Sequence, residues 1–136
     1  MPPEEYRPRK IFSLKEANQT LPLVSRIIQD IVRVNEEMRK THERGLTLAE
    51  EGRAVRAEAA QDQLGELGHQ IEDLADELEG IGCVCKDPAQ GLVDFPARVG
   101  NRTVFLCWKL GEDEIRFWHE LEAGFSGRKP VRGAFA

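Results

Sequence analysis

Two long runs of helical hydrophobic periodicity constrain this chain more than any other feature of its sequence. The first runs from Leu21 to about Arg44, and its apolar residues alternate steps of three and four: Val24, Ile27, Ile31, Val34 and Met38. The second is expected from about Ala54 to Glu79, with the same alternation: Leu64, Leu67, Ile71, Leu74, Leu78 and Ile81. Two such seams are typical of an antiparallel, coiled-coil-like helical hairpin.

Local signals suggest where these helices begin and end. Ser13 and Glu16 form a capping box, which predicts the start of a short helix at Ser13. Pro22 favours a fresh helix start, or a kink, near Thr20. Gly45 suits a helix C-cap, and the linker 45–53 (GLTLAEEGR) is expected to turn the chain, although its middle is also compatible with helix.

The charges of the two helices differ. Eight acidic residues and no Lys or Arg lie between Glu58 and Glu79, whereas the first helix carries Arg26, Arg33, Arg39, Lys40 and Arg44. This difference favours pairing, although exposed ion pairs add only about 0.2–1 kcal/mol each. The acidic stretch has more charge than one partner helix offsets, so we expect self-association, with a homodimer as the simplest form.

After Gly80 the periodicity changes to two, which indicates β-strands. A two-residue turn at Gly100-Asn101 pairs Val99 with Arg102 and thereby sets Asp94 opposite Cys107. The same register puts six apolar residues on one face in three facing pairs: Ala97 with Val104, Phe95 with Leu106, and Val93 with Trp108. This hairpin is expected to begin a small antiparallel sheet packed on the helices.

A second turn at Glu112-Asp113 would pair Trp108 with Phe117 and give a three-stranded sheet. Residues 83–85 are a candidate fourth strand. Residues 112–122 also fit a short helix, so strand and helix both stay open for this segment. The predicted fold class is α+β: a long antiparallel helical hairpin with a three- to four-stranded antiparallel sheet.

The length of 136 residues suits a single domain, and the net charge of −5 makes nucleic acid an unlikely partner. The sequence has no membrane-length apolar run and no signal-peptide pattern, and its three cysteines are an odd number, so we expect a cytoplasmic protein with reduced thiols and no membrane partner. We divide the chain into a loose N-terminal tail (1–12), the helical hairpin (13–80), the small sheet (81–125) and a basic C-terminal tail (126–136).

Three pieces of the sequence resemble a family of small bacterial proteins known only as a domain of unknown function. They are SLKEANQTLPLV (13–24), GLVDFPARVGNRTVFLCWKLGE (91–112) and FWHELEAGFSGR (117–128). The resemblance covers most of the chain and implies one bacterial cytoplasmic domain. It transfers no activity, cofactor or catalytic residue.

The candidate functional surface is the sheet face that carries Asp94. The predicted register places Cys107, Trp118, Glu120 and Arg116 on that face, and His119 on the opposite, apolar face. If residues 112–122 were helical, His119 would swing toward Glu112 or Asp94. The full candidate set is Asp94, Cys107, Glu112, Arg116, Trp118, His119, Glu120 and Arg128. An alternative is that the chain ends, 6–12 and 125–135, fold back and cover this face.

A thiol, a carboxylate and an imidazole can bind zinc or iron. Because neither C-x-x-C nor H-x-x-x-H spacing occurs, we expect no cofactor; if a metal were present, its ligands would be Asp94, Cys107 and His119.

The leading function is a non-enzymatic binding or scaffold module that self-associates through its helices. The alternative is a metal- or thiol-dependent enzyme around the same three residues, and a weaker third is a nucleic-acid-associated factor using the basic tail and exposed Phe105 and Trp118.

Overall fold

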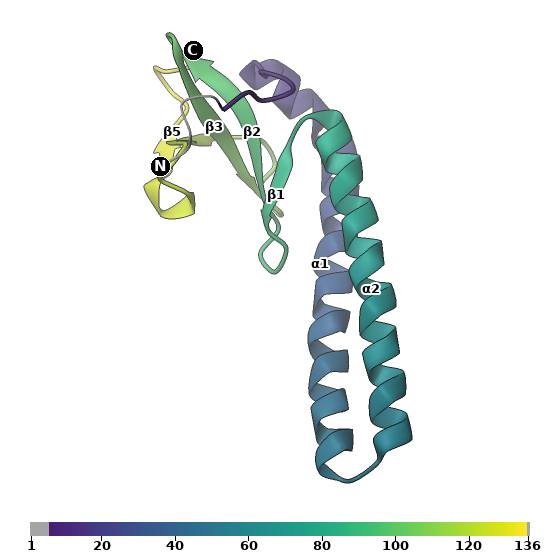
Figure 1. Cartoon of the computed structure of the whole chain (residues 1–136). Coiled ribbons are helices and arrows are strands. Elements are labelled where there is room, and N and C mark those ends of the chain that lie inside the picture. The colour runs from purple at the N-terminus through teal and green to yellow at the C-terminus, as the bar shows by residue number, and fades with distance from the viewer. Residues whose placement is uncertain (1–5, 136) are drawn as a thin grey trace.

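The structure is a computed structural model that describes residues 6–135. A pair of long helices packs at one end against a five-stranded antiparallel sheet, whose strands follow one another in chain order (Figure 1). The elements are α1 (Leu14–Glu50), α2 (Ala54–Ile81), β1 (Val84–Asp87), β2 (Leu92–Val99), β3 (Arg102–Lys109), β4 (Phe117–Glu120), the 3-10 helix η1 (Phe125–Gly127) and β5 (Lys129–Pro130). The predicted α+β class is confirmed, with five strands rather than three or four.

Helix α1 is one continuous helix of 37 residues. Its capping box forms as predicted: the Glu16 amide donates to Ser13 Oγ over 3.0 Å, and the Ser13 amide donates to Glu16 Oε1 over 2.9 Å. Pro22 lies inside this helix, so the predicted fresh helix start near Thr20 is wrong, and so is the predicted C-cap at Gly45. A Cβ at Gly45 would lie 3.4 Å from the Ala60 Cβ on α2, so this glycine serves close helix packing rather than a helix end.

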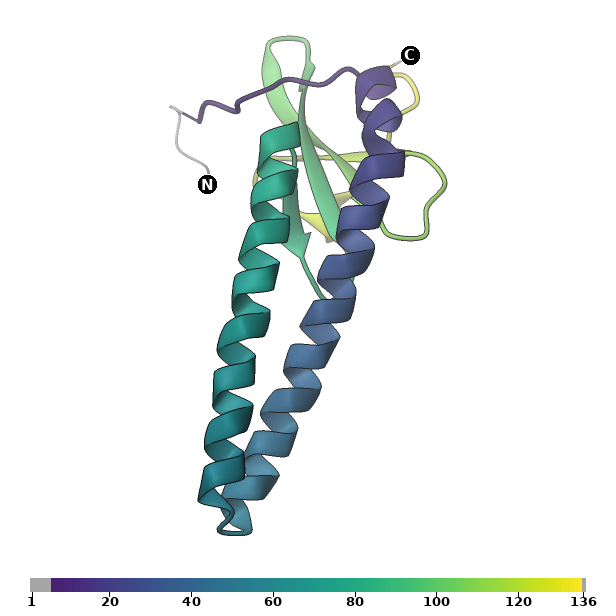
Figure 2. The ribbon, with the colours of Figure 1, turned by 90° about the vertical axis from the view of Figure 1, so that its right-hand side faces the viewer.

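The two helices turn at residues 51–53 and extend well beyond the sheet (Figure 2). Gly52 takes the left-handed conformation that the turn requires, with φ at 75°. The helical pair contributes to the main core at one end only. This end contains the N-terminal part of α1 and the C-terminal part of α2. The distal half of the hairpin therefore has only its own seam to bury, which includes Ala60 and Leu67.

The main core lies between the sheet and the helices. Its largest fully buried side chains include Trp108, Phe95, Leu106, Ile28, Ile31 and Leu78. The β2–β3 register is confirmed: Val99 pairs with Arg102, and Asp94 pairs with Cys107. Gly91 lets the sheet approach α1 closely, because a Cβ there would lie 2.8 Å from the Leu110 Cβ and 3.0 Å from a methyl of Ile28.

The predicted β3–β4 register is wrong by one residue. Phe117 pairs with Cys107 rather than with Trp108, and His119 pairs with Phe105. Since side chains alternate along a strand, the slip moves every side chain of β4 to the other face of the sheet. His119 therefore joins Asp94 and Cys107, while Trp118 joins Leu106 on the core face.

The connection between β3 and β4 explains the slip. It is a loop anchored at several points, not a two-residue turn at Glu112-Asp113. The Lys109 amide donates to Glu112 Oε1 over 2.7 Å, and Trp108 Nε1 donates to the Glu112 carbonyl over 2.9 Å. The Ile115 amide donates to Asn18 Oδ1 on α1 over 2.7 Å. These bonds fix the loop length, so residues 117–120 form a strand rather than the alternative helix.

The described segments near the two ends of the chain, within 6–12 and 125–135, contact the sheet. The Phe12 amide donates to the Pro96 carbonyl over 2.7 Å, and the Phe12 ring is buried against Phe95. At the other end, β5 pairs with β4 and continues the sheet. The part of the predicted N-terminal tail that covers residues 1–5 lies outside the described residues. Between residues 6 and 135, no helix is both long and apolar enough to cross a membrane.

Candidate metal centre

Three neighbouring strands bring Asp94, Cys107 and His119 together on the sheet face that points away from the helices. One ligand atom from each residue (a carboxylate oxygen, the thiol sulfur and a ring nitrogen) lies within 4.8 Å of the other two. The three residues are only 3%, 1% and 2% exposed, respectively. No other trio of His, Cys, Asp or Glu gathers in this way within residues 6–135.

Both ring nitrogens of His119 meet hydrogen-bond acceptors. Nδ1 lies 2.7 Å from the Glu120 carbonyl oxygen, and Nε2 lies 3.0 Å from Asp94 Oδ1. A carbonyl can only accept, so Nδ1 carries a proton and donates it there. Nε2 then donates toward the Asp94 carboxylate. In the metal-free protein the two residues form a buried imidazolium–carboxylate pair.

The surroundings of His119 keep it protonated. Burial by itself lowers the pKa of His119, and this is the largest single effect. Hydrogen bonding to Asp94, Cys107 and the Glu120 carbonyl, together with the Asp94 charge, acts in the opposite direction and raises the pKa from 6.5 to about 10. At neutral pH the imidazole is therefore charged and balanced by Asp94.

One side of the centre is covered by two aromatic residues, Tyr6 from the N-terminal segment and Phe105 from β3. The Tyr6 ring stands edge-on to Phe105 at 6.1 Å between centroids, and the Phe105 ring lies 5.6 Å from the His119 ring. Burial, followed by the Asp94 charge, raises the pKa of the Tyr6 hydroxyl, so this phenol belongs to the same electrostatic environment. Lys86 adds a cation 5.4 Å from the Phe105 centroid.

Arg128 closes the other side. Its guanidinium carbon lies 4.2 Å from the Phe117 centroid and 4.5 Å from the Phe125 centroid, so it sits between the two rings. Its Nη2 donates to the Cys107 carbonyl over 3.2 Å and to Glu112 Oε1 over 2.8 Å. The predicted site residues Glu112 and Arg128 thus form one ion pair beside the centre.

The remaining predicted site residues lie elsewhere. Arg116 pairs with Asp113 at the surface, and Glu120 pairs with Arg102. Trp118 and Phe105, predicted as an exposed aromatic pair, are both buried and lie on opposite faces of the sheet. The alternation of β4 places His119 on a face of the sheet only when the register of β4 with β3 is known. The sequence indicates Tyr6 and Phe125 only as parts of the segments 6–12 and 125–135 that could fold back over this face.

The geometry argues against a cysteine nucleophile. Such a nucleophile needs a ring nitrogen free to take the thiol proton, and both nitrogens of His119 already face acceptors. The thiol of Cys107 is also closed to a substrate by its burial. The chemistry that remains is ligation of an ion or a structural polar cluster.

The donor set fits a tetrahedral metal ion. Bonds of about 2.0–2.3 Å separate the ligand atoms of such an ion by about 3.3–3.7 Å. The distance of 3.0 Å from His119 Nε2 to Asp94 Oδ1 and the upper limit of 4.8 Å for the trio lie on either side of that range. The bond from Nδ1 to the Glu120 carbonyl is the second bond that a metal-ligating histidine usually makes.

Residues 10–131 match the family model described as uncharacterized conserved protein (DUF2203). The chain belongs to the DUF2203 family. The matched region includes both helices, all five strands and the Asp94–Cys107–His119 centre. The resemblance to a domain-of-unknown-function family is thereby confirmed. The chain has no match among curated proteins and none among solved structures.

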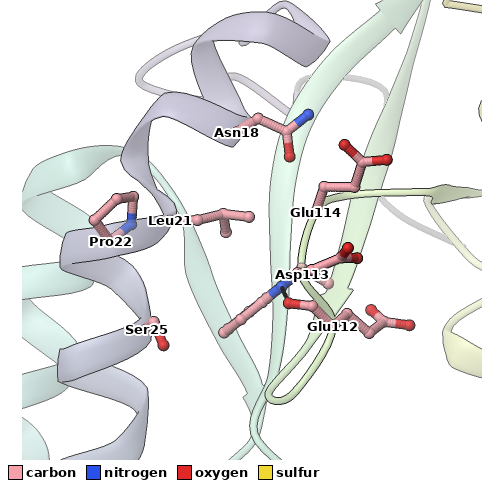
Figure 3. Close-up of a pocket in the computed structure, with 8 residues that line it drawn as sticks. Asn18, Leu21, Pro22, Ser25, Glu112, Asp113 and Glu114 are labelled. Atoms are coloured by element: carbon pink, nitrogen blue, oxygen red, sulfur yellow. Dashed lines mark hydrogen bonds between the residues drawn. The ribbon is translucent and has the colours of Figure 1, made fainter.

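A separate hollow of about 490 Å³ lies between α1 and the β3–β4 loop (Figure 3). It is lined by Asn18, Leu21, Pro22, Ser25, Trp108, Glu112, Asp113 and Glu114. Its acidic side chains are already paired, Glu112 with Arg128 and the other two with Arg116. The hollow therefore offers a ligand little uncompensated charge, and the buried centre is the stronger candidate site.

Proposed function

We propose that this protein is a non-enzymatic binding module that holds one zinc-type divalent ion through Asp94, Cys107 and His119. The observation that carries the proposal is the meeting of three different ligand atoms within 4.8 Å on three neighbouring strands. Strands are rigid supports, and His119 is already oriented by its bond to the Glu120 carbonyl.

The ligand types select the kind of ion. A thiolate and an imidazole favour zinc, or iron as the second choice, over magnesium and calcium, which prefer oxygen ligands. Three protein ligands leave a fourth position for water or another small ligand. A reducing compartment such as the cytoplasm would keep Cys107 available as a thiol, in keeping with the absence of disulfides among the described cysteines.

Charge balance supports exchange of an ion for protons. In the metal-free centre the Asp94 carboxylate and the His119 imidazolium cancel, and Cys107 carries its thiol proton. Binding of a divalent cation releases the Nε2 proton of His119 and the thiol proton of Cys107. Two positive charges enter and two leave, so the net charge of the buried centre is unchanged. The protein thus pays no additional burial cost for net charge when the ion binds.

The burial of the centre favours a closed, structural or sensory ion over a catalytic one. Catalytic zinc sites keep a position open to substrate, whereas the three residues here are at most 3% exposed. The alternative of a metal-dependent enzyme requires the cover over the centre to open during turnover.

Elemental analysis of protein purified without a metal-affinity tag tests the proposal directly. We expect about one equivalent of zinc or iron, and loss of that ion in Cys107→Ser and His119→Gln. Cys85→Ser is the matched control, because it removes a thiol outside the trio. Titration of metal-free protein with cobalt should produce a thiolate-to-cobalt charge-transfer band. A protein that carries no ion and gives no such band contradicts the proposal.

A second role, as a self-associating scaffold, is favoured by the distal half of the hairpin. This half projects beyond the sheet (Figure 2), and its end carries exposed apolar side chains, with Leu46 54% and Val55 83% exposed. We propose that two copies of the chain associate as a homodimer through their helices. The excess of acidic residues on α2 supports contact with the mixed charges of a second α1.

A further inference from the structure

We propose that residues 125–130, called here the strap, form a gate over the Asp94–Cys107–His119 centre, with Arg128 as the latch that holds it shut. This inference rests on the proposed metal-binding function, since it names the route by which an ion would reach the site. A moving element is needed because the three ligand residues are at most 3% exposed. An ion in solution cannot reach them unless part of the cover moves aside.

The strap is a weakly anchored part of that cover. It consists of the single turn η1, which contains no buried residue, and the two-residue strand β5. β5 is the edge strand of the sheet and pairs only with β4, through Phe117 with Pro130 and Trp118 with Lys129. Phe125 remains 39% exposed. Segments with so few buried contacts are the ones that open locally while the rest of a fold stays intact.

Arg128 makes the side-chain contacts of the strap that lie nearest the centre. Its Nη2 bonds to the carbonyl of Cys107, the residue whose thiol is the candidate ligand, and to the carboxylate of Glu112. Its guanidinium also lies between the rings of Phe117 and Phe125. Loss of this side chain would remove the bonds of the strap to β3 and the β3–β4 loop and its contact with the Phe117 ring, and would leave mainly the pairing of β5 with β4 and the Lys129–Glu120 pair to hold it.

The latched state leaves one polar group unsatisfied. Arg128 Nε is buried without a hydrogen-bond partner, the only such side-chain nitrogen or oxygen in the part of the chain that the structure describes. A buried donor without an acceptor is unfavourable, and water can satisfy it once the strap lifts. This unsatisfied donor therefore lowers the free-energy cost of opening the strap.

Thiol labelling of the metal-free protein tests the gate without any assumption about the ion. A small thiol reagent is added in the presence of a chelator, and the labelled cysteines are identified by peptide mass spectrometry. In Arg128→Met we expect Cys107 to react about tenfold or more faster than in the unaltered protein, because local opening becomes more frequent. Arg132→Met is the matched control, since Arg132 is exposed and lies outside the strap.

Cys83 serves as an internal reference for global unfolding, because it is fully buried in the core between the helices and the sheet. Faster labelling of Cys107 with no change at Cys83 supports the gate. An unchanged Cys107 rate, or equal acceleration of both cysteines, overturns it.

Phe125→Ala is a second, milder variant that removes one of the two rings beside the Arg128 guanidinium, and it should also make Cys107 labelling faster. Absence of metal in the purified protein would contradict the proposed function but leave this labelling result intact.

Discussion

His119 Nε2 lies 3.0 Å from Asp94 Oδ1, although β3 separates the strands that carry the two residues. The two side chains reach across β3 beside Cys107 and form a nearly fully buried pair. A buried ion pair contributes little net stability by itself, but the loss of one member leaves an uncompensated charge. The stability of the outer face of the sheet therefore depends on both members of this pair and on their charges.

Replacement of Asp94 by asparagine should strongly destabilise the metal-free protein. The change keeps the shape of the side chain but leaves the His119 imidazolium without a counter-charge. We expect the free energy of unfolding to fall by about 3–5 kcal/mol. Urea denaturation in the presence of a chelator measures it. Arg102→Gln, which breaks the more exposed pair with Glu120, should cost at most about 1 kcal/mol. Similar losses in the two variants would show that the buried pair is not charged.

Stability of the metal-free protein should fall as the pH rises from about 6.5 to 10. The pKa of His119 is raised from 6.5 to about 10, so the folded chain holds a proton that the unfolded chain releases. The resulting stabilisation is complete below pH 6.5 and is lost as the pH passes through about 10. Asp94, Cys107 and Tyr6 also face this centre, and the raised pKa of Tyr6 places its titration at higher pH. Urea midpoints against pH measure the effect, and His119→Gln should lack it.

Zinc should stabilise the protein and release protons when it binds. At a free concentration of about 100 times Kd, the free energy of unfolding should rise by about 2.7 kcal/mol. Titration in weak buffer near neutral pH should release two protons for each ion, one from His119 and one from Cys107. Cys107→Ser should show neither effect. Stabilisation that persists in this variant would place the ion elsewhere on the chain.

The intact protein at micromolar concentration should be a homodimer. Light scattering should give twice the chain mass of 15.4 kDa, and a clean monomer would contradict the scaffold role. Leu74→Asp places a charge in the helical seam, where Leu74 packs against the core, and should unfold or dissociate the protein. Val55→Asp changes only the exposed end of the hairpin, so it should weaken association while the fold is retained.

Features that depend on neighbouring residues could be predicted from the sequence. The capping box of Ser13 and Glu16 and the turn at Gly100-Asn101 are built from residues within a few positions of each other. The turn has a defined length, and this length sets Asp94 opposite Cys107. The prediction that α1 ends at Gly45 is wrong because a glycine has two physical uses, as a helix cap and as a point of close packing. Only the position of Ala60 on the other helix distinguishes them.

The centre itself depended on contacts between distant parts of the chain. The register of β4 follows from a loop held by Asn18 on α1, 97 residues from its partner Ile115. No local pattern reports such a bond, yet a shift of one residue decides whether His119 or Trp118 faces Asp94. The burial of the trio likewise depends on Tyr6 and Arg128, which arrive from opposite ends of the chain.

The sequence by itself determined the paired helices, the α+β class and the facing positions of Asp94 and Cys107, because periodicity and short turns act over a few residues. Only the tertiary structure decided that His119 completes the trio and that the chain ends seal it. Those outcomes depend on how the β3–β4 loop docks on α1 and how the end segments pack against the sheet, and both are set by contacts between residues far apart in the chain.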